Sequence, residues 1–150
     1  MSVGRICCRE VNVVEVTETV EVAAQRMKER SVGTLVVLNA SKEPIGILTD
    51  RDIVTRVVAE RKSPSERRVG QVMTPLPKTV EEDTSIETAL ALMRSGAFRR
   101  LPVVDRAKKL VGVVSLDDVL CLLSEEFSEI GKLIAHAVPA STHKPRDTSR

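Results

Sequence analysis

The sequence predicts an α+β protein made of two pseudo-symmetric β-α-β-β-α repeats that pack sheet to sheet. The main observation is a pattern of residues that recurs after 66 positions and keeps register through helix, strand and turn. The matched pairs include Val20 with Ile86, Met27 with Met93, Leu35 with Leu101, Gly46 with Gly112, and Asp52 with Asp118. The second observation is a count of 23 valines, because β-branched side chains favour buried strands. A repeat of this size buries too little surface alone, so the two copies are expected to share one interface.

Each repeat is expected to begin with an extended approach that leads into a helix. The approaches are residues 11–15 and 78–81, and a helix of about three turns follows each of them. Thr19 is the expected cap of the first helix. Thr84 and Glu87 have the spacing of a capping box at the start of the second.

Two strands joined by a polar turn follow each helix. They are expected over residues 34–38 and 45–49 in the first repeat and over 101–104 and 110–115 in the second. A further helix is expected to start near Asp50 or Leu116. Pro102 has no amide hydrogen, so it is expected to begin its strand or to lie on a sheet edge.

These elements divide the chain into three parts. We expect repeat 1 over residues 6–62 and repeat 2 over residues 69–127, with a linker at 61–68 around Ser63-Pro64-Ser65. A C-terminal extension covers residues 128–150 and is expected to be disordered from about residue 140. Residues 124–137 are expected to continue as an amphipathic helix, which either caps a dimer or binds an effector. Its apolar side consists of Phe127, Ile130, Leu133 and Ile134.

The composition excludes several classes of function. Aromatic residues make up 1% of the chain, so there is no aromatic platform for bases and no cage for a quaternary ammonium. The net charge of +2 resides in residues 139–150, and the neutral remainder argues against a nucleic-acid partner. Apolar runs are far shorter than the ~20 residues of a membrane span. Cys7, Cys8 and Cys121 lack metal-ligand spacing and are expected to be reduced, so we expect a cytoplasmic protein without a membrane partner.

Polar side chains recur where the last strand of each repeat meets the next helix. Gly46 is followed by Thr49 and Asp52, and Gly112 is followed by Ser115 and Asp118. A hydroxyl three residues before an acid is typical of a plain helix cap. An aspartate in the first turn can also accept hydrogen bonds from ribose hydroxyls. Repetition after a glycine, which permits close backbone approach, favours this second role.

Taken together, the repeated motifs resemble the tandem cystathionine-β-synthase (CBS) domain pair, or Bateman module, over about residues 6–127. The motifs are Gly-h-h-[Thr/Ser]-x-x-Asp in both copies, Val72-Met73-Thr74-Pro75, and Phe98-Arg99-Arg100-Leu101-Pro102-Val103. The resemblance implies a regulatory adenosyl ligand (AMP, ADP, ATP, NAD or S-adenosylmethionine) in two clefts between the repeats. Aliphatic side chains and backbone groups would hold the adenine, so no aromatic residue is required.

The resemblance also implies which residues line each cleft. The first cleft would join Thr49 and Asp52 to Pro77, Lys78, Thr79, Val80, Arg99 and Arg100. The second would join Ser115 and Asp118 to Asn12, Val13, Val32, Gly33 and Thr34. Arg51 is a further candidate for a phosphate, near the start of its helix. The first cleft is expected to bind phosphorylated ligands more tightly, because Arg99 and Arg100 match the neutral Gly33 and Thr34.

The expected function is that of a regulatory nucleotide sensor that signals to an effector protein and forms a homodimer. The alternative is a ligand-free dimerisation or interaction module. Its surface would be the apolar rows of the second helices: Ile53, Val54, Val57, Val58, Val119, Leu120, Leu122 and Leu123. A small thiol-dependent enzyme using Cys7 or Cys8 is the third hypothesis. No catalytic residue and no metal ligand is expected, because His136 and His143 both lie outside the repeats.

Overall fold

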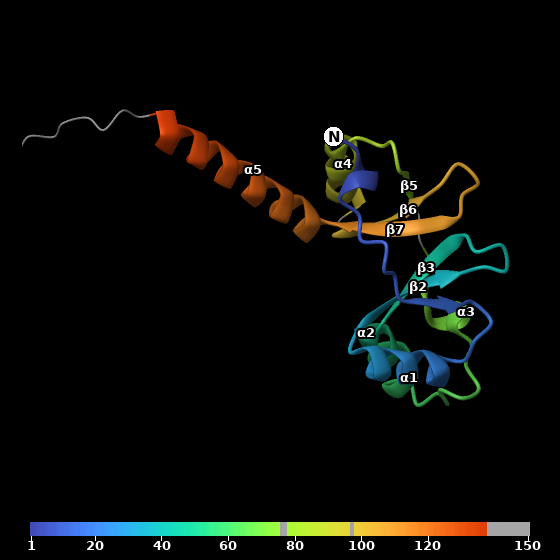
Figure 1. Cartoon of the computed structure of the whole chain (residues 1–150). Helices are drawn as coiled ribbons and strands as arrows, with labels where there is room; N and C mark the ends of the chain where they lie inside the picture. Colours follow the sequence, from blue (N-terminus) through green and yellow to red (C-terminus); the bar gives the residue numbers. More distant parts are fainter. Residues whose placement is uncertain (76–77, 97, 138–150) are drawn as a thin grey trace, which may run out of the picture.

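Two β-sheets face each other across the middle of the molecule in the computed structural model, which describes residues 1–75, 78–96 and 98–137 (Figure 1). The first repeat contributes a four-stranded sheet in the order β1-β2-β3-β4, and the second a three-stranded sheet in the order β5-β6-β7. Helices lie on the outer side of each sheet. The predicted α+β fold of two packed repeats is confirmed. The expected disordered tail lies outside the described residues.

The strands follow the predicted order in both repeats. Their bounds are Val13–Glu15 (β1), Thr34–Leu38 (β2), Pro44–Thr49 (β3), Thr74–Pro75 (β4), Val80–Glu81 (β5), Arg100–Val104 (β6) and Leu110–Ser115 (β7). The first strand of each repeat runs parallel to the second, which pairs antiparallel with the third. The register repeats as well, because Leu35 lies opposite Leu48 and the matched Leu101 lies opposite Val114.

The helices differ more between the repeats than the strands do. They are Val20–Arg30 (α1), Asp50–Ile53 (α2), Val69–Val72 (α3), Ile86–Gly96 (α4) and Leu116–Ala137 (α5), with a 3₁₀ turn at Val3–Arg5. The short α2 continues as a π-helical segment, Val54–Val58. Its counterpart α5 is one uninterrupted helix of 22 residues that extends away from the sheets (Figure 1). The predicted amphipathic continuation beyond residue 124 is therefore confirmed.

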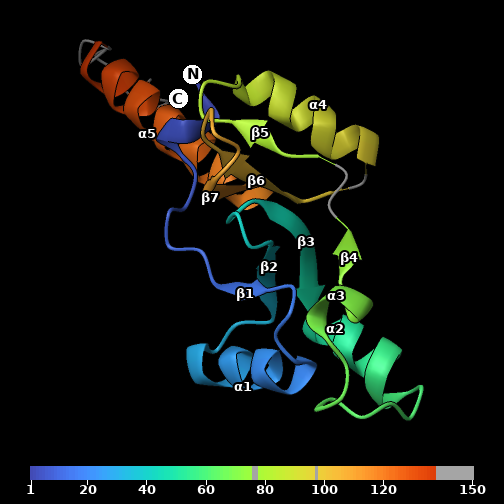
Figure 2. The same cartoon turned by 90° about the vertical axis from the view of Figure 1, so that its right-hand side faces the viewer.

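The lead-in segment of each repeat packs against the other repeat (Figure 2). Cys8 forms a β-bridge with Val113 at the free edge of the second sheet, and the matched Thr74 pairs with Ile47 in the first sheet. The amide of Val3 donates to the carbonyl of Thr84 at 2.9 Å. Because each lead-in segment is hydrogen-bonded to the other repeat, the two repeats are held to each other. The 66-residue match also extends almost to the N-terminus.

The helix caps are confirmed in the first repeat and corrected in the second. Thr19 accepts a hydrogen bond from the amide of Val22 at the start of α1. The predicted capping box of Thr84 and Glu87 is wrong, because Ser85 Oγ accepts from the Thr88 amide at the start of α4. Ser85 is the residue that matches Thr19. Thr84 closes the preceding turn instead and accepts from the amide of Glu81, as Glu18 does from Glu15 in the first repeat.

The position of Pro102 also differs from the expectation. It is the third residue of β6, the central strand of its sheet, so the prediction that it begins a strand or lies on an edge is wrong. In the first repeat, the amide of the matched Val36 donates to the Asn12 carbonyl. Pro102 has no such donor, and β5 pairs with β6 only from Val103 onward. The amide donor that Pro102 lacks would therefore face the chain before the start of β5, where no strand pairing is lost.

Each repeat has an apolar core between its sheet and its helices. Val14, Leu35 and Leu48 are central to the first core, and Val80, Leu101 and Val114 to the second. The apolar rows of the second helices divide between core and surface. Val57 and Val119 are buried, whereas Val54, Val58, Leu120 and Leu123 are exposed.

The ion pair of Glu18 with Arg26 predicts a stability that depends on pH. Arg26 donates two hydrogen bonds to the carboxylate of Glu18, and these lower the pKa of Glu18. A carboxyl group with a lowered pKa stabilises the folded state above its unfolded pKa, and this contribution is lost as the pH falls through its folded pKa. Glu18→Gln is expected to lower the free energy of unfolding at pH 7 by about 1 kcal/mol. Urea unfolding at a series of pH values should show the difference from wild type shrinking below the ordinary pKa of glutamate. A constant difference at all pH values would contradict this assignment.

Candidate ligand cleft

A cavity of about 130 Å³ lies between the two sheets, and we call it the central cavity. Six of its lining residues form three matched pairs: Thr34 with Arg100, Val36 with Pro102, and Ile47 with Val113. The segment that crosses between the repeats supplies the remaining four, Cys8, Glu10, Val11 and Asn12. The lining is mostly apolar, with a single cation at Arg100 among these ten residues. The cavity therefore lies between the copies, to one side of the pseudo-twofold axis that relates them.

The pseudo-symmetry implies a second cleft on the other side of this axis. The residues of the second repeat that match Cys8, Glu10, Val11 and Asn12 in the sequence are residues 74 and 76–78. Residues 76 and 77, including the predicted site residue Pro77, lie outside the described residues. Lys78 is exposed just before β5.

At the end of β3, Thr49 and Asp52 form a complete capping box. The Asp52 amide donates to Thr49 Oγ1 at 3.1 Å, and the Thr49 amide donates to Asp52 Oδ2 at 3.0 Å. Asp52 is buried, and its Oδ1 lies 3.4 Å from Nη2 of Arg56. Arg56 also donates to the Val72 carbonyl and to Thr74 Oγ1 in the lead-in segment of the second repeat. A ligand hydroxyl at Asp52 would therefore compete with Arg56.

At the end of β7, Ser115 and Asp118 form the matching arrangement, and no salt bridge engages Asp118 among the described residues. Asp118 Oδ2 accepts from both the amide and the hydroxyl of Ser115 at 2.7 Å. Its Oδ1 has no hydrogen-bond partner within the described part of the chain. The residue that matches Arg56 is Leu122, which cannot pair with a carboxylate. Asp118 thus keeps one oxygen available to a hydroxyl donor.

A second cavity, of about 250 Å³, lies at the base of α5, and we call it the base cavity. Asp118 lines it together with Arg5, Ile6, Cys121, Leu122 and Glu125. Arg5 belongs to the lead-in segment, so the exchange of segments brings a cation to the same cavity as Asp118. Neither Arg5 nor Arg56 was predicted as a site residue. The 66-residue match could have drawn attention to the segment that contains Arg5, because the preceding Gly4 matches Gly70.

The predicted site residues divide among several surroundings. Asn12, Thr34 and Arg100 line the central cavity. Arg100 lies opposite Ser115 in the β6-β7 pair, and Thr34 lies opposite Thr49 in the β2-β3 pair. The strand pairing thus places the hydroxyl residue of each capping box opposite a residue that lines the central cavity. It also places Arg100 with Asn12 and Thr34, whereas the resemblance grouped it with Thr49 in the other cleft.

The structure does not bring the other predicted residues into the central cavity. Val80 is 4% exposed and belongs to the second core. Val32 packs against the first core, and Val13 lines an outer cavity with Arg26 and Lys42. Arg99 lines a different cavity from Arg100, beside α4, because successive side chains of an extended chain point to opposite faces. Three further predicted residues also lie outside the central cavity. Arg51 is exposed and Thr79 is half-buried. The Gly33 carbonyl accepts a hydrogen bond from the Asp50 amide.

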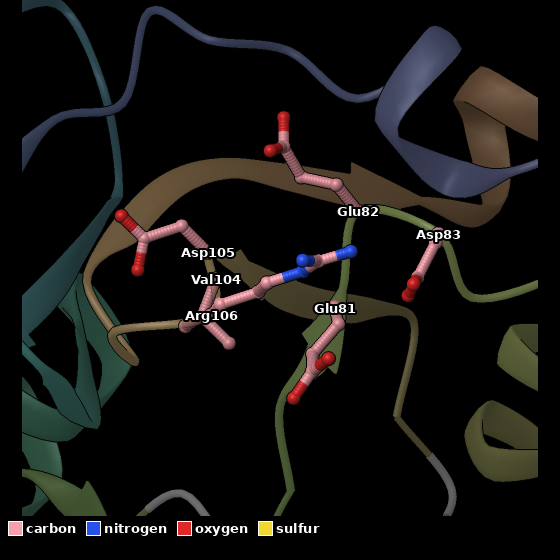
Figure 3. A pocket seen from close by; sticks show the side chains of 6 residues that line it. All are labelled: Glu81, Glu82, Asp83, Val104, Asp105 and Arg106. Atoms are coloured by element: carbon pink, nitrogen blue, oxygen red, sulfur yellow. The ribbon is translucent and has the colours of Figure 1, made fainter.

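An acidic cavity of about 180 Å³ lies where β5 and β6 end (Figure 3). Glu81, Glu82, Asp83 and Asp105 surround the side chain of Arg106 there. Lys108 donates a hydrogen bond to Glu81 and lowers the pKa of that carboxyl group. The excess of carboxylates makes this cavity unsuitable for a phosphate.

Three further observations concern metals, thiols and membranes. Within residues 1–75, 78–96 and 98–137, no group of three or more His, Cys, Asp or Glu side chains could hold a metal ion. Cys7, Cys8 and Cys121 are free thiols, and burial raises the pKa of Cys7. Across the same residues, no helix combines the length and the apolar character needed to cross a membrane.

Comparison with known proteins places the repeat in a family. The CBS domain model matches twice, over residues 3–59 and 69–125. A protein from Methanopyrus kandleri is 41% identical over 120 residues, which are 80% of this chain and 61% of that protein. This chain therefore spans less than two thirds of the length of that relative.

Solved structures share the fold. The CBS-pair protein CBSX2 from Arabidopsis thaliana superposes with a TM-score of 0.72 at 26% identity, covering 85% of this chain and 96% of that one. The CBS domain pair of protein MJ0100, solved in complex with 5′-methylthioadenosine and S-adenosyl-L-methionine, gives a TM-score of 0.69 at 21% identity. That match covers 84% of this chain and 98% of the other.

Proposed function

Because this chain belongs to the CBS-domain family and carries two CBS domains in tandem, we propose that it is a regulatory module that binds an adenosyl ligand between its repeats. The observation that supports this most directly is the central cavity, where both repeats contribute matched residues around Arg100. Pockets at the interface between two domains are preferred ligand sites. The MJ0100 pair, whose structure contains two adenosyl compounds, supports the chemical class of the ligand.

In this proposal, different residues bind the adenine, the ribose and the charged group of the ligand. The apolar walls around Val36, Ile47 and Val113 hold the adenine. Asp118 accepts hydrogen bonds from the ribose through its available oxygen, while Ser115 keeps the carboxylate in place. Arg100, and Arg5 in the base cavity, bind a phosphate or a carboxylate of the ligand. Thr49, Asp52, Lys78 and Thr79 serve the cleft on the other side of the pseudo-twofold axis, which is the first cleft of the sequence analysis.

The size of the central cavity supports a sensing role. At about 130 Å³ it is smaller than the roughly 300–1,000 Å³ of ordinary ligand pockets, so an adenosyl ligand fully enclosed between the sheets would have to move them apart. The turns of the two β-hairpins oppose this movement. Lys109 Nζ donates to the Ser41 carbonyl at 2.5 Å, and the Leu110 amide donates to the Lys42 carbonyl at 3.3 Å. A ligand that prefers the opened arrangement shifts the population toward it, and an effector protein reads the change.

The chemistry of the site supports ligand binding rather than catalysis. The hydroxyls of Thr49 and Ser115 are engaged in helix caps, and burial disfavours the thiolate form of Cys7. The thiol-dependent enzyme is therefore less well supported than the sensor. A ligand-free interaction module remains the alternative, because Val54, Val58, Leu120 and Leu123 are exposed.

A thermal-shift panel of AMP, ADP, ATP, NAD and S-adenosylmethionine tests the proposal. A ligand at about 100 times its Kd stabilises the folded protein by about 2.7 kcal/mol, which corresponds to a rise in Tm of roughly 5–10 °C. Guanosine and cytidine nucleotides at equal concentration are the controls for unspecific phosphate binding. We expect at least one adenosyl compound to raise the Tm and the controls to leave it unchanged. An unchanged Tm across the whole panel would favour the ligand-free module.

A further inference from the structure

The two capping boxes differ in what faces the second oxygen of the aspartate. Arg56 Nη2 lies 3.4 Å from Oδ1 of Asp52, whereas the matching residue in the second repeat is Leu122. We propose that Arg56 is a built-in competitor for Asp52, so that this chain binds one adenosyl ligand tightly, at Asp118, and a second at Asp52 only weakly. Within the proposed function, on which this rests, Arg56 is the residue that makes the two clefts unequal.

Contacts with the lead-in segment of the second repeat hold Arg56 in place. Its Nη1 donates to the Val72 carbonyl at 2.8 Å and to Thr74 Oγ1 at 3.1 Å. Thr74 is itself fixed, because it pairs with Ile47 of β3. A guanidinium is planar and rigid, so anchoring one nitrogen also sets the direction of the other. Arg56 therefore differs from a freely moving surface cation, whose ion pairs contribute little.

Both oxygens of Asp52 are engaged while Arg56 stays in place. Oδ2 accepts from the Thr49 amide at 3.0 Å, and Oδ1 faces the guanidinium. The side chain of Asp52 is only 12% exposed, so little of the carboxylate can be reached from solvent. A ribose hydroxyl must therefore displace the guanidinium and leave its charge without this carboxylate. The displacement raises the Kd of the cleft.

In the second repeat, the matching leucine leaves Asp118 uncontested. Leu122 has no group that can donate a hydrogen bond to a carboxylate. Arg5 lines the same cavity as Asp118, but the two form no salt bridge among the described residues. Ser115 donates to Asp118 Oδ2 from its amide and its hydroxyl, both at 2.7 Å, and so fixes the carboxylate. A ribose can bind Oδ1 there without breaking an ion pair.

The position of Arg100 increases the difference between the clefts. The resemblance grouped Arg99 and Arg100 with Asp52, and the cleft of Asp52 was therefore expected to be the tighter one. The structure places Arg100 opposite Ser115 in the β6-β7 pair and in the central cavity, and Arg99 in another cavity. In our proposal the order of affinities is the reverse, because the cleft of Asp118 has both an available oxygen and a cation.

Isothermal titration of the full chain with each of AMP, ADP, ATP, NAD and S-adenosylmethionine tests the competition. For a compound that binds, we expect wild type to take up one equivalent tightly and a second at least tenfold more weakly. Arg56→Leu copies the second repeat and should lower the Kd of the weak site about tenfold, which corresponds to about 1.4 kcal/mol. Loss of a positive charge would by itself weaken the binding of an anionic nucleotide, so neither general electrostatics nor loss of stability explains a gain. Arg56→Lys retains the cation and should keep the two sites unequal.

The reciprocal variant tests the same competition in the other repeat. Leu122→Arg places a guanidinium one turn after Asp118, where the base cavity of about 250 Å³ leaves space for it, and should raise the Kd of the tight site about tenfold. It leaves Val72 and Thr74 untouched, so it decides the question if Arg56→Leu fails to fold. Two equal sites in wild type, or a weak site that Arg56→Leu does not improve, would overturn the role of Arg56 and leave the proposed function standing. No binding of any of the five compounds to wild type or variants would overturn both.

Discussion

Asp118→Asn is expected to raise the Kd for the adenosyl ligand about ten- to a hundredfold. This corresponds to the roughly 1.5–3 kcal/mol that a hydrogen bond to a charged group contributes. Asparagine can keep the oxygen that accepts from the Ser115 amide, so the helix cap survives. Its NH₂ group cannot accept from a ribose hydroxyl as the available Oδ1 of Asp118 does. Isothermal titration with the ligand identified by thermal shift measures the change.

Two other variants make this measurement specific. Asp117→Asn removes the same charge from the neighbouring exposed residue, which takes no part in the cap, and should leave the Kd within about twofold. Asp52→Asn should weaken binding less than Asp118→Asn, because Arg56 already engages Asp52 Oδ1. An equal loss in Asp117→Asn and Asp118→Asn would show a general electrostatic effect rather than a ribose contact. A larger loss in Asp52→Asn would assign the tighter cleft to the first repeat.

Gly112→Ala is expected to lower the free energy of unfolding by about 2 kcal/mol, the middle of the range for overpacked sites. A Cβ atom at this position would lie 2.8 Å from Cys7 Sγ and 2.9 Å from the Cys8 carbonyl oxygen. The carbonyl cannot move freely, because Cys8 is held by its β-bridge with Val113. The glycine of the repeated motif is therefore needed for the crossing of the lead-in segment. Urea unfolding measures the loss.

Gly131→Ala is the matched control for this glycine. No atom lies within 4 Å of a Cβ built at Gly131 in α5, so its substitution should cause no loss of stability. It can add up to about 1 kcal/mol to the helix, because alanine has the higher helix propensity. If Gly112→Ala were as stable as wild type, the lead-in segment would have to be loosely attached, and the fixed relation of the two repeats would be contradicted.

Local patterns in the sequence predict much of the fold because they reflect local physics. The helical face from Val20 to Met27 and the strand pairs around Gly46 and Gly112 follow from periodicity alone. The errors have a common cause. Thr84 has the spacing of a helix cap, but Ser85 caps the helix instead. Pro102 lacks an amide hydrogen, as is typical of an edge residue, but it lies in a central strand. In both cases the contacts of neighbouring residues determine the outcome.

The candidate site shows the same division. The two capping boxes could be predicted because a hydroxyl and an acid three residues apart interact locally. Arg99 and Arg100 line different cavities because their side chains point to opposite sides of an extended chain, and spacing alone does not predict which side faces which cavity. The position of Arg5 depends on a lead-in segment that crosses to the other repeat. The role of Arg56 requires knowledge of a contact with Val72 and Thr74, which are distant in sequence.

The sequence by itself determined that this protein is a tandem repeat with matched hydroxyl and acid pairs, because those features depend on residue type and spacing. It also determined the apolar stripe that continues to Ala137. Only the tertiary structure decided which carboxylate oxygen is available, which cation faces which cavity, and which apolar side chains remain exposed. These properties depend on how the side chains and elements are placed in space, and that placement leaves no periodic signal in the chain.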